Sequence, residues 1–463
     1  QDEFSEWFTQ IMLKADLADY SSVSGCIILK PGSYALWERI KQAVDIKLKQ
    51  LAIQNVSFPL FIPEKLLQQE QDHVEGFAPE VAWVTHAGNT KLAERLAIRP
   101  TSEAIMYESY AKWIRSWRDL PLKYNQWNNV VRWEFKHPVP FLRTREFLWN
   151  EGHTAYATQE EAEQEGKAIM DLYQDVCEHL LALPALRGRK SDKEKFAGAV
   201  YTESLEFLLP NGKAIQGPDF HYDGTNFAKA YNITYLDKDG TKQFVHQNTF
   251  AISTRMLGVM FALHSDSKGL ILPPAIAPHQ AVIVPILFEK TKDKTLQEAK
   301  KLQKALKKYN ALLDDRDEYT PGYKLNEWDL KGIPLKIEIG PKDLAKKQVI
   351  VSRRDTGEKK AVSTKQLPSY VEKTLKDIQA TLLKQAQARL YSHITEASTK
   401  QHVISALKKK HIALAPHCGQ RDCEDTLKHE TGGAKVLNIP SKQPSQKKPC
   451  IICNKPAAYY AYI

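Results

Sequence analysis

Hydrophobic positions along the chain recur with two spacings, which predict helices that alternate with strands. Spacings of three and four residues place one apolar stripe on a helix that begins near Pro31, made of Trp37, Ile40, Val44, Leu48 and Leu51. The run VSFPLFIP (56–63) is short, apolar and bounded by prolines, which predicts a strand. A second helix is predicted after RPTSE, with Thr101 or Ser102 as its N-cap and with one face made of Met106, Tyr110, Trp113 and Trp117.

Charged and apolar residues alternate in the stretch NNVVRWEFKHPVPFLRTREFLWNEGHTAY (128–156). Arg132 and Glu134 alternate with apolar neighbours, and a strand would place both charges on one face. After the proline-broken loop KHPVPF, a second alternating series follows, made of Arg143, Arg145, Phe147 and Trp149. The pattern predicts two antiparallel strands joined by a loop.

The prolines of LPPAIAP (272–278) indicate a domain boundary. Beyond them the pattern is typical of an α/β domain: an apolar run at 281–288, a lysine-rich helix over 296–309, and the strands KIEIG and QVIVSRR. From about Pro368 a long polar helix leads into a cysteine-bearing tail. A length of 463 residues suits two to three domains, and we predict boundaries at 1–273, 274–375 and 376–463.

Composition narrows the class of protein. The chain is 43% hydrophobic and 26% charged, as in ordinary globular proteins, and it has no apolar run near the roughly 20 residues that span a bilayer. A net charge of +10 suits a polyanionic partner, although a solvated lysine-rich surface explains it equally well. The first residues contain no apolar signal core and no initiating Met, so we expect a cytoplasmic protein whose natural N-terminus lies upstream.

The chemistry that the alternating stretch suits is activation of a carboxylate by ATP. That reaction needs cations against the phosphates and an aromatic face for adenine, and Arg132, Arg143 and Phe147 are able to meet around one nucleotide. An exposed strand pair decorated with salt bridges is the alternative. No phosphate loop of the GxxxxGK(S/T) type occurs in the sequence, so an ATP site has to be built in this other way.

Three motifs in order resemble those of class II aminoacyl-tRNA synthetases. RWE, a loop and RTREF resemble motif 2, VSFPLFIP resembles motif 1, and STRMLGVMFALHSDSKGLILPP resembles motif 3 with Arg255 as its arginine. In that class the motif 1 proline, here Pro59, lies at a dimer interface. The blocks FAPEVAWVT, AIRPTSEAIMY, GRKSDKEKFAG and KAIQG narrow the resemblance to prolyl-tRNA synthetases of the eukaryotic and archaeal kind, and it covers nearly the whole chain.

The resemblance implies a fold, a function and roles for individual residues. It implies an α+β catalytic domain with an antiparallel sheet and flanking helices, an α/β anticodon-binding domain and a small zinc-binding α+β domain. Arg132 and Arg255 would act in catalysis. Proline would be bound by Thr101, Glu103, Arg132, Phe77, Trp149, His153 and His221. ATP would be bound by Arg132, Arg143, Thr144, Phe147, Gln216, Ser253 and Arg255, with Glu206 as a candidate Mg²⁺ ligand.

One segment departs from the family pattern. Where the family usually shows GGTSHHLGQNF, this chain has GPDFHYDGTNF (217–227), so Pro218, Asp219 and Phe220 replace small residues beside His221. A pocket that fits proline also admits alanine and cysteine, because each missing methylene costs only about 1–3 kcal/mol. Between Tyr156 and Ser253 there is no room for the editing insertion of bacterial members. We therefore predict misactivation of cysteine or alanine.

The tail carries two close cysteine pairs, Cys418 with Cys423 and Cys450 with Cys453. This spacing predicts a structural tetrahedral Zn²⁺ site, with His417 as an alternative ligand and four unrelated reduced thiols as the alternative interpretation. In the family the C-terminal domain packs on the catalytic domain and ends in tyrosine. This chain ends in YYAYI, which leaves Tyr462 or a trimmed terminus for that role.

The expected function is that of a cytoplasmic, homodimeric proline–tRNA ligase that uses ATP with Mg²⁺, L-proline and tRNA(Pro), without a membrane partner. Glu338, Lys342 and Arg353 are predicted to contact the anticodon, although a surface charge cluster explains each of them nearly as well. A threonine enzyme would be expected to hold zinc in its active site. A catalytically silent RNA-binding protein would be expected to lack one of the arginines.

Overall fold

A seven-stranded sheet organises the N-terminal part of the chain. The computed structural model describes residues 4–73, 80–134, 137–445 and 448–463. In the sheet every neighbouring pair of strands is antiparallel except the first, which confirms the expected antiparallel catalytic domain. In spatial order the strands are β3 (Gln54–Asn55), β7 (Leu122–Val131), β8 (Glu146–Tyr156), β14 (His246–Ser253), β11 (Ala214–Gly224), β10 (Tyr201–Leu208) and β9 (Leu186–Arg189).

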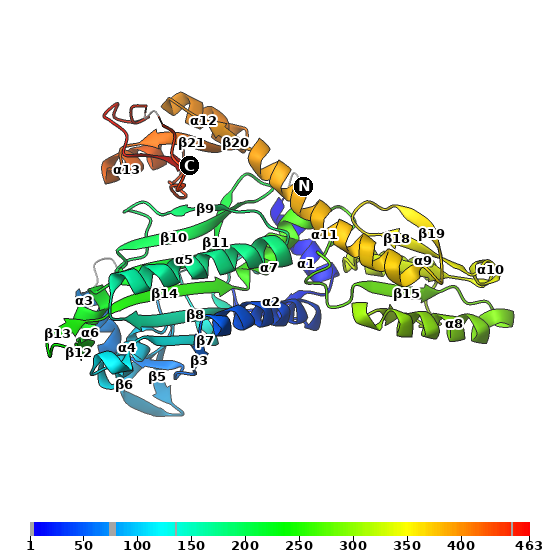
Figure 1. Cartoon of the computed structure of the whole chain (residues 1–463), viewed down its shortest axis with the longest axis horizontal. Coiled ribbons are helices and arrows are strands. Elements are labelled where there is room, and N and C mark those ends of the chain that lie inside the picture. Colours follow the sequence, from blue (N-terminus) through cyan, green and yellow to red (C-terminus); the bar gives the residue numbers. More distant parts are fainter. Residues whose placement is uncertain (1–3, 74–79, 135–136, 446–447) are drawn as a thin grey trace.

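Helices cover one face of this sheet and part of the other. Figure 1 shows α5 lying across the strands, and Gly166 allows it to approach so closely that an added Cβ would lie 2.5 Å from the Phe220 ring. One core is shared by this face and by α1 (Phe4–Lys14), α2 (Pro31–Gln50), α5 (Gln159–Asp175) and α7 (Arg255–His264). A second core holds α3 (Glu64–His73), α4 (Glu103–Trp113) and α6 (Asn226–Tyr231). The part of the opposite face that these helices leave open carries the candidate site.

Smaller sheets border the catalytic sheet. They pair β1 (Ala18–Tyr20) with β2 (Ile27–Leu29), β6 (Thr90–Ile98) with β4 (Phe61–Pro63) and β5 (Trp83–Ala87), and β12 (Thr234–Leu236) with β13 (Lys242–Phe244). The predicted helix near Pro31 is confirmed as α2, whose apolar stripe is buried except at Leu51 just beyond its end. The strand predicted over 56–63 is wrong for most of its length, because only Phe61–Pro63 pairs, with β6. Pro59 lacks the N–H that a paired strand needs there.

The hairpin predicted over 128–156 is confirmed in its pairing but not in its extent. Val131 lies opposite Glu146 at the loop end of the hairpin, so Arg132 stands one residue beyond β7 instead of inside it. The Trp133 backbone N–H donates to the Glu80 carbonyl at 3.0 Å, which draws the chain away from β8.

At α4, Ser102 occupies the N-cap position but its side chain does not cap the helix. Trp117 lies beyond the end of α4, so the predicted four-residue face is wrong at that residue.

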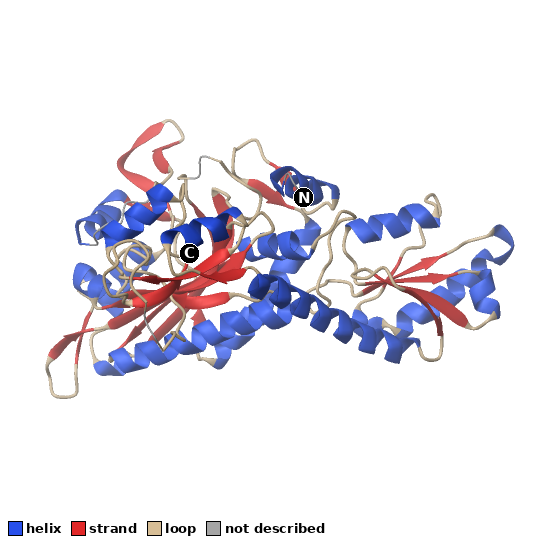
Figure 2. Cartoon of the chain, turned by 90° about the horizontal axis from the view of Figure 1, so that it is seen from above, coloured by secondary structure: helices blue, strands red, loops and turns tan. Residues whose placement is uncertain are grey.

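The middle of the chain folds around a five-stranded sheet. Its order is β16 (Leu312–Leu313), β15 (Ala281–Pro285), β17 (Leu335–Ile339), β18 (Gln348–Arg353) and β19 (Lys359–Ser363), and the first three strands are parallel. The lysine-rich helix is α8 (Lys292–Ala305), and α9 (Pro321–Leu330) and α10 (Pro341–Ala345) follow. From above, in Figure 2, these strands form a second sheet well separated from the catalytic one.

A long helix joins this sheet to the tail. It is α11 (Leu367–Ser392), which Figure 1 shows running from the middle domain to the C-terminal domain. The C-terminal domain has β20 (Ile394–Glu396), β21 (Ile412–His417), β22 (Tyr459–Tyr462), α12 (Lys400–Lys408) and α13 (Arg421–Glu430). It packs on the edge of the catalytic sheet, where Asn438 donates to the Leu186 carbonyl at 2.8 Å. Within the described ranges, no helix is both long and apolar enough to cross a membrane.

Candidate active site

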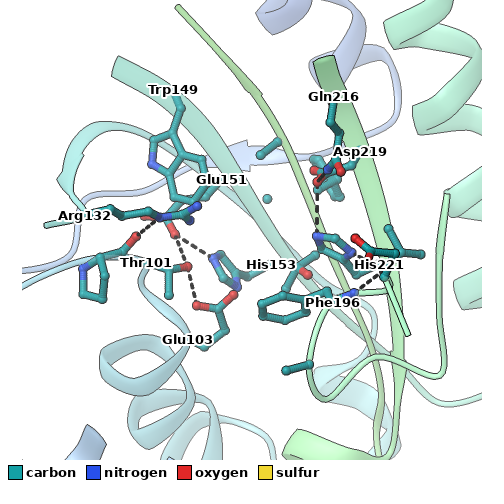
Figure 3. Close-up of a pocket in the computed structure, with 18 of the residues that line it drawn as sticks. Thr101, Glu103, Arg132, Trp149, Glu151, His153, Phe196, Gln216, Asp219 and His221 are labelled. Atoms are coloured by element: carbon teal, nitrogen blue, oxygen red, sulfur yellow. Dashed lines mark hydrogen bonds and ion pairs between the residues drawn. The ribbon is translucent and has the colours of Figure 1, made fainter. Parts of the chain in front are cut away.

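Two adjoining cavities open on the face of the catalytic sheet opposite α5. The larger has a volume of about 400 Å³ and the smaller about 110 Å³. Figure 3 shows the side chains of the larger cavity converging from α4, from β8 and from β11. Five residues line both cavities: Arg132, Trp149, Gln216, Asp219 and Ala251. A ligand that occupied both cavities would therefore pass Arg132 and Asp219 at their junction.

The floor of the larger cavity is acidic. Glu103, in the first turn of α4, lines this cavity and is only 4% exposed. Its carboxylate accepts a hydrogen bond from the Thr101 hydroxyl, so these two predicted residues lie side by side. A nearly buried carboxylate suits a cationic amine, since a charge-assisted hydrogen bond offsets the cost of burying both charges.

Glu151 lies beside this floor and was not among the predicted site residues. Its carboxylate accepts hydrogen bonds from the Ser102 backbone N–H at 2.9 Å and from the Asn128 side chain at 2.6 Å, and its Oε2 lies 3.1 Å from His153 Nε2. The signal in the sequence was the alternation itself, because positions 147, 149, 151 and 153 share one face of β8. The Ser102 hydroxyl does not cap α4, because it donates a hydrogen bond to Glu151 instead.

Glu151 and His153 behave as a buried ion pair. Burial raises the pKa of Glu151, but His153, Ser102 and Asn128 outweigh burial and hold that pKa at about 2. Burial lowers the pKa of His153, and the opposing carboxylates of Glu151 and Glu103 raise it above its ordinary value. The other ring nitrogen of His153 lies 3.2 Å from the Tyr107 hydroxyl. The pair thus orients the floor and leaves Glu103 facing the cavity.

The opposite wall is formed by β11 and the segment before β10. His221 lies between Thr202, whose hydroxyl is 2.8 Å from Nδ1, and Asp219, whose Oδ2 is 3.5 Å from Nε2. The Phe196 ring packs on the imidazole with centroids 4.6 Å apart, and burial lowers the pKa of His221. A neutral imidazole between an aromatic ring and polar groups forms a flat wall for a small ring. Figure 3 shows this wall across the cavity from Glu103.

Asp219, from the segment that departs from the family pattern, stands at the junction of the cavities. The Gln216 amide donates to its Oδ2 at 2.6 Å. Asp219 is not among the predicted site residues, although it lies in the segment 217–227 that departs from the family pattern. Its carboxylate adds a negative charge where the cationic groups of Arg132 and Arg255 otherwise dominate, and Asp219 opposes the fall in the pKa of Arg255.

The smaller cavity collects most of the residues predicted to bind ATP. It is lined by Arg132, Thr144, Phe147, Gln216, Ser253 and Arg255. The Arg132 guanidinium lies 5.5 Å from the Phe147 ring centroid and 5.1 Å from that of Trp149, and its Nε donates to the Pro100 carbonyl at 3.1 Å. Arg255 donates to the carbonyls of Leu142 and Gln216, each at 3.0 Å, and burial lowers its pKa to about 10, so it stays charged at neutral pH.

Among the described residues, Arg143 and Glu206 are predicted site residues that do not line these cavities. Arg143 is exposed and does not line either cavity, although its charge acts on Arg255. Phe77 lies outside the described residues. Glu206 is buried on β10, where Lys190 binds it at 2.5 Å and Ser204 donates to it at 2.8 Å. Burial raises the pKa of Glu206, and the positive charge of Lys190 acts in the opposite direction. The ion pair with Lys190 means that the Glu206 carboxylate already has one cationic partner.

Two groups of side chains in the described part of the chain have a metal-like arrangement. The Sγ atoms of Cys418, Cys423, Cys450 and Cys453 lie within 4.8 Å of one another, and those of Cys418 and Cys453 are 3.7 Å apart. Zn–S bonds of about 2.3 Å in a tetrahedron separate sulfurs by about 3.8 Å, so the four thiols fit a zinc ion. His417 is not in this group; its Nδ1 accepts from the Gly419 N–H at 3.0 Å.

The second group is Glu103, Glu151 and His153. It fits a metal poorly, because the imidazole of His153 is engaged on both nitrogens and its pKa is raised. A metal ligand needs a free, neutral nitrogen. The floor of the larger cavity is therefore better suited to an organic cation.

The residues predicted to contact an anticodon lie on the middle domain. Glu338 on β17 is bound by Lys359 at 3.0 Å, and Lys342 is in α10. The Arg353 guanidinium is held by Asp355 at 2.8 Å and by Asp377 at 2.5 Å, which raises its pKa.

Comparison with known families agrees with this geometry. The model of the tRNA synthetase class II core domain (G, H, P, S and T) matches residues 84–264, that of an anticodon binding domain matches 280–374, and that of the prolyl-tRNA synthetase C-terminal domain matches 401–463. The sheet, the two cavities and these matches together define a class II aminoacyl-tRNA synthetase.

Relatives narrow the class to one family. A proline–tRNA ligase of Natranaerobius thermophilus is 46% identical over 98% of this chain and 93% of its own length. A putative proline–tRNA ligase of Saccharomyces cerevisiae is 46% identical over 99% of this chain and 71% of its own. The prolyl-tRNA synthetase of Cryptosporidium parvum, solved with halofuginone and AMPPNP, aligns with a TM-score of 0.96 at 43% identity, covering 99% of this chain and 97% of that one. The chain belongs to the prolyl-tRNA synthetase family.

Proposed function

We propose that the chain activates L-proline with ATP and transfers the prolyl group to the 3′ end of tRNA(Pro), as a proline–tRNA ligase. The observation that carries this proposal is the pairing of a buried carboxylate, Glu103, with a guanidinium, Arg132, across one cavity. A zwitterionic amino acid needs both charges. The Phe196 ring packed on His221 gives the cavity a flat wall, which favours a compact ring.

In the proposed reaction Glu103 and Thr101 hold the secondary ammonium of proline, and Arg132 holds its carboxylate at the junction of the cavities. The triphosphate lies along Arg132 and Arg255, with adenine against Phe147. An oxygen of the proline carboxylate attacks the α-phosphorus, and pyrophosphate leaves. The terminal ribose hydroxyl of the tRNA then attacks the acyl carbon and AMP leaves. Positioning and charge stabilisation carry the rate, and a strong general base is not needed.

Metal ions have two roles in this proposal. Mg²⁺ bound with ATP would neutralise phosphate charge. Glu206 is our candidate residue to hold it, and its carboxylate would have to exchange Lys190 for the metal. The four tail thiolates hold a structural zinc ion, supported by their mutual distances of at most 4.8 Å. A reducing compartment such as the cytoplasm suits the zinc site, because all six cysteines are free thiols and the four of the cluster would have to stay reduced to bind zinc.

We also propose a homodimer formed around Pro59. An apolar patch supports it: Leu60 is 37%, Phe61 44% and Trp113 50% exposed, and Phe58 packs on Trp113 with centroids 5.9 Å apart. Large exposed apolar side chains that cluster in this way are typical of interfaces. Light scattering after size exclusion checks the proposal, and a monomeric mass at micromolar concentration would rule it out.

The test of the main proposal is exchange of labelled pyrophosphate into ATP with proline, run beside threonine, cysteine and alanine. Strong exchange with proline is expected. Exchange with threonine alone would reassign the substrate. Binding of tRNA without exchange for any amino acid, in protein that is folded and supplied with zinc, would favour a silent RNA-binding protein.

A further inference from the structure

One wall of the amino-acid cavity is a segment that both the catalytic domain and the C-terminal domain contact. Glu194, Phe196 and Ala197 line the cavity, and Phe196 covers His221. The segment 190–199 joins β9 to β10 without forming a helix or strand. Within the catalytic domain it is held at both ends: Lys190 pairs with Glu206 at 2.5 Å, the Phe196 backbone N–H donates to the Thr202 hydroxyl at 2.9 Å, and the Asn226 amide donates to the Gly198 carbonyl at 2.7 Å.

The C-terminal domain supplies the contacts that hold the rest of this segment. Just ahead of it, Arg189 exchanges two backbone hydrogen bonds with Ile439, of 3.0 and 2.7 Å. The Ser191 hydroxyl donates to Glu424 Oε2 at 2.9 Å. Lys193 binds Asp425, and Lys435 binds Glu194 at 2.9 Å. Each of these contacts joins residues more than two hundred positions apart in the sequence.

The Ser191–Glu424 contact differs from the others in its burial. Ser191 is 1% exposed and Glu424 is 4% exposed, whereas Asp425 and Lys435 lie at the surface. A buried hydrogen bond to a charged acceptor contributes more than an exposed ion pair, which water and salt weaken. Glu424 therefore contributes most of the specific attachment, and Lys435 adds a direct contact to Glu194, which lines the cavity.

We propose that Glu424, with Lys435, is a positioning residue that holds the 190–197 segment against the amino-acid cavity. The C-terminal domain then sets the affinity for the amino acid from outside the catalytic domain. Glu424 follows Cys423 directly on α13, so the cysteine cluster fixes the helix from which Glu424 reaches the segment. This inference rests on the proposed function, since it concerns how proline is held.

The expected effect is selective for the amino acid. Because Glu424 acts on the wall formed by Phe196 and not on the cavity of Arg255 and Phe147, its loss should weaken proline binding and leave ATP binding unchanged. Glu424→Ala is expected to raise KM for proline about tenfold, as loss of one buried hydrogen bond to a charged group implies. Glu424→Gln keeps an oxygen that accepts the hydrogen bond from Ser191. Its KM for proline is therefore expected to lie close to that of the parent.

The experiment measures KM for proline and for ATP in the exchange reaction, together with hydrogen–deuterium exchange of the peptide covering 190–199. Glu430→Ala is the matched control, since it removes an acid from the same helix that binds Lys400 instead of the segment. Faster hydrogen exchange in 190–199 with the raised KM in Glu424→Ala, and neither change in Glu430→Ala, would support the inference. Zinc content is measured in every variant, so a lost metal is recognised.

Two further variants keep the test decisive if Glu424→Ala does not fold. Ser191→Ala removes the same hydrogen bond from the catalytic side, and Lys435→Met removes the contact to Glu194. An unchanged KM for proline and unchanged hydrogen exchange in both would overturn the inference, while the parent chain would still catalyse exchange. Absence of exchange in the parent at every proline concentration would instead overturn the proposed function.

Discussion

At the scale of single residues, the amino-acid cavity depends on one buried charge. Glu103 faces the cavity, whereas the Glu151 carboxylate is hydrogen-bonded to Ser102, Asn128 and His153. The two acids therefore have different roles although they lie close together. We propose that the carboxylate that still faces the cavity, that of Glu103, meets the substrate. Glu151, which Ser102, Asn128 and His153 hold in place, organises the floor.

Replacing Glu103 separates these roles. Glu103→Gln keeps the size and the hydrogen bond with Thr101 but removes the charge that faces the ammonium, and we expect kcat/KM for proline to fall about 100-fold, mainly through KM. KM for ATP should change little. Steady-state pyrophosphate exchange measures both, with Glu108→Gln on the exposed side of the same helix as the control. A fall in kcat/KM below threefold would show that the ammonium binds elsewhere.

The pair of Glu151 and His153 predicts a pH dependence of stability. Glu151 has a folded pKa of about 2 against an ordinary 4.5, so its contribution is complete above pH 4.5 and is lost as pH falls toward 2. His153 has a folded pKa above its ordinary 6.5, so its contribution is complete below pH 6.5 and is lost as pH rises through the folded value. The pair therefore stabilises the fold most between about pH 4.5 and 6.5.

Urea unfolding followed by tryptophan fluorescence checks this window. The midpoint of the parent should exceed that of His153→Gln by more at about pH 5.5 than at about pH 9, because the protonated imidazole is absent from the variant. His179→Gln, at an exposed position, is the control. A difference between parent and His153→Gln that does not shrink toward alkaline pH would contradict the raised pKa.

At the scale of elements, the sequence was informative where the periodicity was local. The stripe of α2 and the antiparallel hairpin of β7 and β8 were predictable because each needs only its own residues. The strand over 56–63 is interrupted by Pro59, a signal that the sequence itself carries. The end of β7 before Arg132 was not predictable, because the hydrogen bond between Trp133 and Glu80 joins segments distant in sequence. Glu151 shares the alternation of β8, whereas Phe196 becomes a site residue through tertiary contacts alone.

The cysteine cluster is an element-scale feature with its own test. Cys450→Ser removes one of four sulfurs, and a three-sulfur site should bind zinc much more weakly, so we expect substoichiometric metal and faster proteolysis of the segment around β21, α13 and β22. Elemental analysis and limited proteolysis measure these effects. Cys26→Ser is the matched control, because Cys26 lies outside the cluster. Full zinc content in Cys450→Ser would exclude a four-thiolate site.

At the scale of the whole molecule, the catalytic domain lines the amino-acid cavity and the C-terminal domain contacts one of its walls from outside. The floor comes from the N-terminal half of α4, the walls from the catalytic sheet, and the 190–197 segment is braced by a domain that begins some two hundred residues later. α11 connects the middle sheet to that brace. The middle domain, which the family model identifies as anticodon-binding, is thus joined by one continuous helix to the C-terminal domain that contacts the 190–197 segment.

The same architecture limits selectivity. Between Tyr156 and Ser253 the chain forms α5, α6 and strands of the catalytic sheet and its border, so the described residues there contain no separate editing domain. The walls of the cavity attract proline but have no means of repelling a smaller side chain, and a missing methylene costs only about 1–3 kcal/mol. We therefore expect alanine and cysteine to support pyrophosphate exchange, with kcat/KM roughly 100-fold or more below that of proline.

Asp219→Thr, which restores a small residue at the edge of the cavity, should change the ratio of kcat/KM for proline to kcat/KM for alanine and cysteine. Asp237→Thr on the surface should leave this ratio unchanged. Undetectable exchange with both alanine and cysteine would mean that the wall at 217–223 excludes small substrates, which would make Asp219 and its neighbours the basis of selectivity in this chain.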